Sequence, residues 1–182
     1  MSEVVETCWG PREISDRPYW HLANKDWNYD ALFKNNVRAG KGALLSVSAG
    51  IEAEPEIENA QTPYSFRNMG NEKEQLFERI REANYPDLPP RLKSLYVFDD
   101  YVLVERALNE WFPNEEKIVH ECRVLASANL HKADTTWLNS YPQQWVQAAK
   151  QYWSGNTTSS YFPETLVHGA LYFPDWVDWE NA

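Results

Sequence analysis

The feature that most constrains the fold is an alternation of helix-like and strand-like hydrophobic spacing between residues 17 and 173. The segments expected to be strands are 17–23, 43–48, 92–98, 118–125 and 165–173. The segments expected to be helices are 71–83, 100–111 and 140–153. This order predicts an α+β domain with a mixed or antiparallel sheet.

Local signals set the ends of the predicted helices. In the first helix, Leu76, Phe77 and Ile80 lie on one face among charged residues. Prolines at positions 86, 89 and 90 then prevent the helix from continuing. Asp99 is the expected N-cap of the second helix, and Ser140 that of the third.

The remaining segments are expected to be less regular. Residues 24–42 and the acidic, proline-broken stretch 52–70 are predicted to be loops. We expect an N-terminal arm over 1–16, one domain over 17–174 and an acidic tail over 175–182.

Composition excludes several classes of protein. Aromatic residues make up 14% of the chain, which argues against extensive disorder. The 27 acidic and 17 basic residues give a net charge of −10, which disfavours a protein that coats nucleic acid. No apolar run approaches the length of a membrane span, and the N-terminus does not read as a secretory signal. Two isolated cysteines indicate neither a zinc knuckle nor a disulfide framework, so we expect a cytoplasmic protein.

Familiar catalytic motifs are missing from the sequence. It contains no dinucleotide-binding glycine motif after a strand, no phosphate-binding loop, no zinc-protease helix and no nucleophile elbow. The histidines lack close metal-ligand spacing, and we expect no metal. His21 is interpreted either as a core histidine or as a cleft residue that donates to a ligand hydroxyl. Three carboxylates, Glu121, Asp134 and Glu164, are candidates for a site or for ordinary solvated and capping positions.

Taken together, five segments resemble a bacterial and phage family of unknown function related to ADP-ribosyltransferases. These segments are YWHLA (19–23), FERIREANYPDLPPRLKSLYVFDD (77–100), IVHECRV (118–124), HKADTTWLN (131–139) and QYWSGNTTSSYFPETLVHGALYF (151–173). The resemblance implies an ADP-ribosyltransferase-like split, mixed β-sheet, with flanking helices around an NAD cleft.

ADP-ribosyltransferases of the diphtheria-toxin and poly(ADP-ribose) polymerase class use a His, Tyr and Glu on three strands. Here His21, Tyr96 and Glu164 match those positions. The resemblance implies that His21 holds a ribose hydroxyl, Tyr96 stacks on nicotinamide and Glu164 bonds the 2′-hydroxyl of the nicotinamide ribose.

Additional contacts to NAD are expected beside those three residues. Arg91 could contact a phosphate, and Ser94 the nicotinamide-side ribose; a surface role for Arg91 is the alternative. Leu22 stands where many members of the class have glycine, and it would supply backbone hydrogen bonds to the nicotinamide amide. No E-x-E or Q-x-E pair precedes the last strand, which differs from the arginine-directed toxin pattern. Glu121 is the substitute for Glu164 as the catalytic acid.

The resulting hypothesis is a mono-ADP-ribosyltransferase that uses NAD as a substrate and modifies a protein or nucleic acid acceptor. A toxin or phage–bacteria conflict effector, silenced by an antitoxin or inhibitor partner, fits the family's setting. An RNA 2′-phosphotransferase or NAD glycohydrolase on the same fold is one alternative. A non-catalytic binding module, with its tryptophans or acidic tail facing a partner, is the other.

Overall fold

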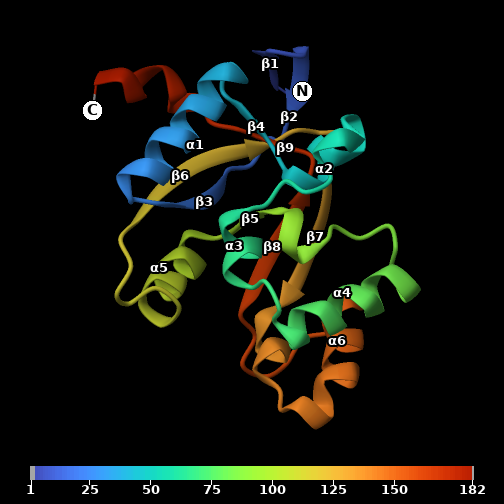
Figure 1. Cartoon of the computed structure of the whole chain (residues 1–182). Coiled ribbons are helices and arrows are strands. Elements are labelled where there is room, and N and C mark those ends of the chain that lie inside the picture. The colour runs from blue at the N-terminus through green and yellow to red at the C-terminus, as the bar shows by residue number, and fades with distance from the viewer. Residues whose placement is uncertain (1–2, 182) are drawn as a thin grey trace. The chain divides into compact units, whose positions relative to one another are not determined.

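The computed structural model describes residues 3–181, which divide into two compact units. The first unit contains the chain up to Leu45, Val97–Ala128 and the residues from Gly169 onward. The second contains Ser46–Tyr96 and Asn129–His168. Each unit draws on segments that are far apart in the sequence (Figure 1). The division of the chain into an arm, one domain over 17–174 and a tail stays a prediction.

The first unit is built around a four-stranded antiparallel sheet with the order β3-β6-β9-β4. Its elements are β1 Glu3–Thr7, β2 Gly10–Ile14, β3 Tyr19–Asn24, α1 Trp27–Ala39, β4 Ala43–Leu45, α5 Tyr101–Glu110, β6 Lys117–Val124, β9 Ala170–Tyr172 and the 3-10 segment η5 Pro174–Asn181. Strands β1 and β2 form an antiparallel hairpin, so residues 3–14 of the expected arm are regular structure.

The second unit contains a three-stranded sheet with the order β5-β8-β7, in which β7 and β8 are antiparallel. Its elements are α2 Val47–Ala53, η1 Pro55–Ile57, α3 Pro63–Arg67, α4 Glu72–Asn84, η2 Arg91–Lys93, β5 Leu95–Val97 (of which Val97 belongs to the first unit), β7 Asn129–Asp134, η3 Thr135–Asn139, η4 Pro142–Gln144, α6 Trp145–Trp153 and β8 Pro163–His168.

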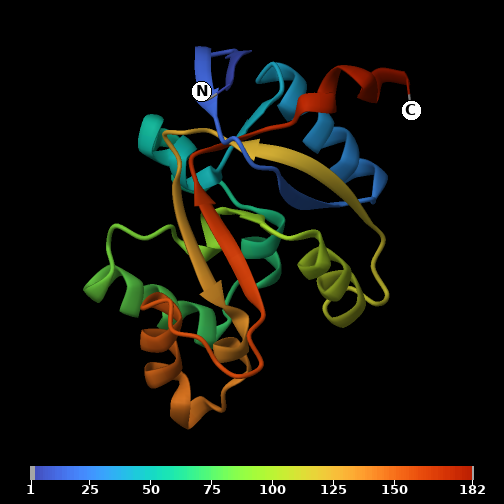
Figure 2. The ribbon, with the colours of Figure 1, turned by 180° about the vertical axis from the view of Figure 1, so that it is seen from behind.

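Helices α4 and α6 lie side by side in this second unit, as both ribbon views show (Figure 2). Phe77 and Ile80 of α4 and Tyr152 and Trp153 of α6 form one buried core with Leu166 of β8. The Trp153 indole also donates to the carbonyl of Phe77, so it leaves no polar group unpaired in the core. This core fixes the helices against the sheet that carries Glu164.

The α+β class is confirmed, and of the two sheet types left open by the sequence, the strand pairs described above are antiparallel. The three predicted helices are present as α4, α5 and α6, although α6 starts at Trp145 after a short 3-10 turn. Helix α5 is capped by the Asp100 side chain, not by Asp99. Both aspartates precede the apolar face of the helix, and the sequence pattern does not fix the first helical residue.

The two predicted loops are wrong in large part. Residues 24–42 contain the 13-residue helix α1, which Asp26 caps and in which Val37 is fully buried. The asparagines of α1 and the two glycines that follow it are poor helix formers, so the sequence pattern does not predict this helix. Residues 52–70 hold the end of α2 and the short segments η1 and α3. Thr62 and Ser65 form a reciprocal capping box that starts α3.

The last predicted strand is two strands in two sheets. Gly169 separates β8 from β9 with a φ of +136°, which L-residues with a side chain rarely adopt. A Cβ atom there would lie 2.8 Å from the Ala128 Cα. Strand β7 was not predicted at all, because its exposed and buried residues do not alternate regularly.

Candidate functional site

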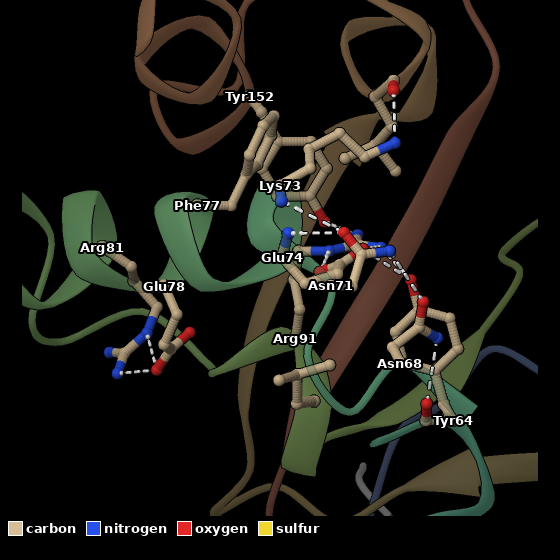
Figure 3. A network of polar contacts seen from close by, with 12 residues as sticks. Tyr64, Asn68, Asn71, Lys73, Glu74, Phe77, Glu78, Arg81, Arg91 and Tyr152 are labelled. Atoms are coloured by element: carbon tan, nitrogen blue, oxygen red, sulfur yellow. Dashed lines mark hydrogen bonds and ion pairs between the residues drawn. The ribbon is translucent and has the colours of Figure 1, made fainter. Parts of the chain in front are cut away.

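Arg91 is the centre of a buried polar network in the second unit (Figure 3). It follows the proline turn that ends α4 and lies in η2, with 2% of its surface exposed. Its guanidinium donates to Glu74, Glu164, Tyr152 and Tyr64. Burial disfavours the charge of Arg91, but Glu164 and the neighbouring groups outweigh burial and raise its pKa well above its ordinary value.

Glu164, the second residue of β8, meets Arg91 directly. One carboxylate oxygen accepts both from the Arg91 guanidinium and from the Tyr152 hydroxyl, the latter at 2.6 Å. Glu164 is 6% exposed. The ion pair and Tyr152 cover the carboxylate, so Glu164 is not a solvated acid.

Glu74 gives Arg91 a second carboxylate partner. Its Oε2 lies 3.0 Å from the Arg91 Nε, and its Oε1 accepts from the Tyr64 hydroxyl at 2.7 Å. Burial acts to raise the pKa of Glu74, but the charge and hydrogen bonds of Arg91 outweigh it and lower that pKa. The network thus holds one cation between two carboxylates.

Tyr96 and Ser94 follow Arg91 along the chain. The Tyr96 hydroxyl donates to the Arg91 carbonyl, and its ring centroid lies 5.4 Å from that of Tyr64. Ser94 is 2% exposed, and its hydroxyl has no hydrogen-bond partner within residues 3–181. A buried hydroxyl without a partner is uncommon, and a polar ligand group or an ordered water would satisfy it.

The structure brings Tyr96, Arg91, Ser94 and Glu164 into one unit, while His21 and Leu22 belong to the other. His21 lies opposite His120 in the β3–β6 register and is therefore on the same face of the sheet.

The environment of His21 is aromatic. Its ring stacks on Phe33 at 5.7 Å and meets the Phe173 ring edge-on at 6.1 Å. Phe33 also stacks on Trp179 of the tail segment. His21 is half-buried in this aromatic packing, so both interpretations of His21 stay open.

Glu121, the alternative acid, lies in the first unit on β6. Its side chain is exposed, and it pairs with Arg123 at 3.1 Å. It opposes Trp20 in the sheet register. The surface alternative for Arg91 is excluded by its burial, whereas a solvated acid describes Glu121 well.

Sequence reasoning missed Tyr64, Glu74 and Tyr152. Glu74 precedes Phe77 by one helical turn, so it belongs to the buried face of α4. A buried acid on an apolar helical face needs a hydrogen-bonding or cationic partner, and Arg91, directly after Pro89 and Pro90, is one candidate in the sequence. Tyr64 had no such signal, because its segment is predicted to be a loop.

The described residues contain neither a cluster of metal-ligand side chains nor a membrane-spanning helix. In residues 3–181, no three His, Cys, Asp or Glu side chains gather as a metal site would require. No helix in that range is long and apolar enough to cross a bilayer.

A model for a family of proteins of unknown function, DUF2441, matches residues 51–178. The chain belongs to the DUF2441 family. A search of curated proteins found no match. The DUF2441 region contains Tyr64, Glu74, Arg91, Tyr152 and Glu164 but begins after His21. The buried network, unlike the His21 cluster, thus lies wholly within the part that defines the family.

Proposed function

We propose that this DUF2441 protein is an NAD-dependent mono-ADP-ribosyltransferase whose catalytic carboxylate is Glu164. The observation that carries the proposal is the position of Tyr96 and Glu164 on neighbouring strands, β5 and β8, beside one buried arginine. A pair of separate sheets, each bearing residues matched to the transferase class, also supports it. The role of His21 rests on the resemblance alone.

The reaction requires a carboxylate at a developing positive charge. The bond between C1′ of the ribose and nicotinamide breaks, and an acceptor nucleophile forms its bond to C1′ while losing a proton to solvent. The sugar resembles an oxocarbenium ion in the transition state. A fixed carboxylate at that point stabilises the transition state more than the ground state. Glu164 supplies the charge, and Tyr96 supplies an aromatic surface for the leaving ring.

The ion pair explains how Glu164 is held before substrate binds. Arg91 and Tyr152 fix one oxygen of the carboxylate, and fixed groups need little reorganisation when charge develops. The ribose 2′-hydroxyl would take the place of one of these donors. The expected contact of Ser94 with the nicotinamide-side ribose stays a prediction, because the Ser94 hydroxyl is buried and unpaired among the described residues.

Labelled NAD tests the proposal with wild-type protein, Glu164→Gln and Glu121→Gln. The protein is incubated with cell lysate, with parallel samples treated with nuclease or protease. We expect Glu164→Gln to lower transfer about 100-fold or more while NAD binding persists. Glu121→Gln, which alters an exposed acid in the other unit, should retain activity.

The treated samples separate the alternatives. Label removed only by protease indicates a protein acceptor, and label removed only by nuclease indicates nucleic acid. Nicotinamide release without label indicates a glycohydrolase. Full activity in Glu164→Gln would rule out Glu164, and activity lost only in Glu121→Gln would move the site to β6.

A binding module is the second candidate, and the burial of Glu164 favours it. A carboxylate that is 6% exposed and fully engaged with Arg91 is also what a structural ion pair looks like. If folded wild-type protein neither releases nicotinamide nor transfers label, the binding module is the better description.

A further inference from the structure

A second group of catalytic type lies in the same unit, away from Arg91. His168, at the end of β8, is hydrogen-bonded on both ring nitrogens to residues of α2. Its Nδ1 lies 2.9 Å from the Ser48 Oγ, and its Nε2 lies 2.8 Å from a Glu52 carboxylate oxygen. Hydrogen bonds thus connect a serine to a histidine and the histidine to an acid.

The partners fix the tautomer of His168. The Glu52 carboxylate can only accept a hydrogen bond, so Nε2 carries the proton in the neutral ring. Nδ1 is then a bare acceptor, and the Ser48 hydroxyl donates to it. This is the arrangement that a general base needs to take a proton from a serine nucleophile.

Ser46 supports the nucleophile from the other side. Its hydroxyl lies 3.1 Å from the Ser48 Oγ and accepts from the Ala49 amide. Because Ser48 gives its proton to His168, Ser46 is the donor between the two hydroxyls. Ser46 is 1% exposed and Ser48 only partly buried, so a rigid residue orients a reachable one.

A depression of about 450 Å³ is lined by His168 and Glu52. Ser48 does not line it and is joined to it through the hydrogen bond with His168. Its apolar wall is made by Pro86, Leu88, Pro89 and Pro90. This volume is within the range of small-ligand sites.

Two polar side chains hold the backbone of this wall in place. Arg81 donates to the carbonyls of Pro86 and Leu88, and Asn129 donates to that of Asp87. The charge of Arg81 is already paired with Glu78. The depression therefore presents an apolar face next to the histidine without offering a free arginine to an anion.

We propose that Ser48, His168 and Glu52 form a hydrolytic site for small carboxylic esters, with the apolar part of the ester against the proline wall. Ser48 Oγ bonds to the carbonyl carbon and its proton passes to His168 Nδ1. The ester C–O bond breaks, and the alcohol leaves with that proton. Water then attacks the acyl group, His168 takes and returns a proton, and free acid and Ser48 are regenerated.

A fluorophosphonate probe and p-nitrophenyl acetate test the site on the full chain. We expect the probe to modify Ser48, identified by peptide mass spectrometry, and Ser48→Ala to lose both labelling and ester hydrolysis. Ser160→Ala, which changes an exposed serine elsewhere in the same unit, should retain both.

Substitutions of His168 and Glu52 should slow labelling and hydrolysis to different degrees. Loss of the base in His168→Gln should slow both reactions about 100-fold or more. Glu52→Gln should slow them less, because 75% of the Glu52 side chain is exposed and water can replace it. Thermal unfolding checks that each variant is folded.

Three outcomes overturn the inference. These are no labelling of folded wild-type protein, an adduct on another residue, and equal hydrolysis by wild-type and Ser48→Ala protein. Because Ser48, His168 and Glu52 are not part of the Arg91 network, labelling and hydrolysis by wild-type and Ser48→Ala protein test this inference independently of the transferase proposal.

Discussion

The Arg91 guanidinium and the Glu164 carboxylate form an ion pair whose side chains are 3% and 7% exposed. The same guanidinium also pairs with Glu74, which is 4% exposed. Charges buried to this degree interact strongly, but each depends on the others for the solvation it has lost. Removal of the single cation therefore leaves two carboxylates uncompensated.

Arg91→Met should destabilise the protein by about 3–5 kcal/mol, as measured by urea unfolding at pH 7. Arg106→Met is the control, because its pair with Glu110 is exposed and should contribute less than about 1 kcal/mol. Adding Glu164→Gln to Arg91→Met should recover part of the loss. Strictly additive effects of the two changes would contradict the coupling that the geometry implies.

His120 should make the protein sensitive to mild acid. Burial, and then the neighbouring His21, lower the pKa of His120 from 6.5 to about 4. The unfolded chain therefore binds a proton at a higher pH than the folded chain does. The free energy of unfolding is not reduced by His120 above pH 6.5, and it falls as the pH drops toward 4.

We expect His120→Phe to gain about 2 kcal/mol relative to wild type when both are moved from pH 7 to pH 5. The two proteins share every other titratable group, so the change in their difference reports His120 together with its coupling to His21. Urea unfolding at the two pH values measures it. A difference that does not change with pH would show that His120 titrates normally.

Segments with a strong local pattern were predictable from the sequence. The apolar spacing of Phe77 and Ile80 predicted α4, and the run 118–125 predicted β6. The pattern failed where tertiary contacts decide. Helix α1 owes its position to packing of Val37, and β7 exists because β8 pairs with it.

The site was predictable only in part. Glu164 and Tyr96 could be chosen from a resemblance, but their burial around Arg91 depends on partners up to 73 residues away in sequence. Tyr152 is an ordinary core aromatic in the helical pattern of α6, and only the folded structure directs its hydroxyl at Glu164. Periodicity predicts a face, whereas a buried polar network requires the register between elements.

The two cysteines should differ in reactivity. Cys8 is exposed, whereas Cys122 is buried on β6, and burial raises the pKa of its thiol. A thiolate is the reactive form, so a buried thiol with a raised pKa reacts slowly. A disulfide reagent should therefore modify one thiol per native chain and two after denaturation. Cys8→Ser should abolish the native reaction, and fast modification of Cys122 in that variant would contradict its burial.

Asp134 should anchor the loop that leads into β8. It is fully buried, and its carboxylate accepts from the Thr136 and Phe162 amides and from both the amide and hydroxyl of Thr158. Burial acts to raise the pKa of Asp134, but these hydrogen bonds outweigh burial and lower the pKa from 3.8 to about 2.

The direction of the pH effect follows from that shift. The folded chain keeps Asp134 ionised at a lower pH than the unfolded chain does. The stabilisation, about 2 kcal/mol, is complete well above pH 4 and is lost as the pH falls toward 2, with about half gone at pH 3. Asp134→Asn removes this dependence and also turns an amide donor toward the Thr158 donors.

Asp134→Asn should therefore be clearly destabilised at pH 7 and less so at pH 3, as measured by urea unfolding at both values. Asp100→Asn is the matched control, because it keeps an N-cap acceptor on an exposed residue and should cost little. In Asp134→Asn, faster proteolysis within residues 156–162 should accompany the loss, since that loop loses its anchor. Equal destabilisation at both pH values would mean that the carboxylate charge is not what holds the loop before Glu164.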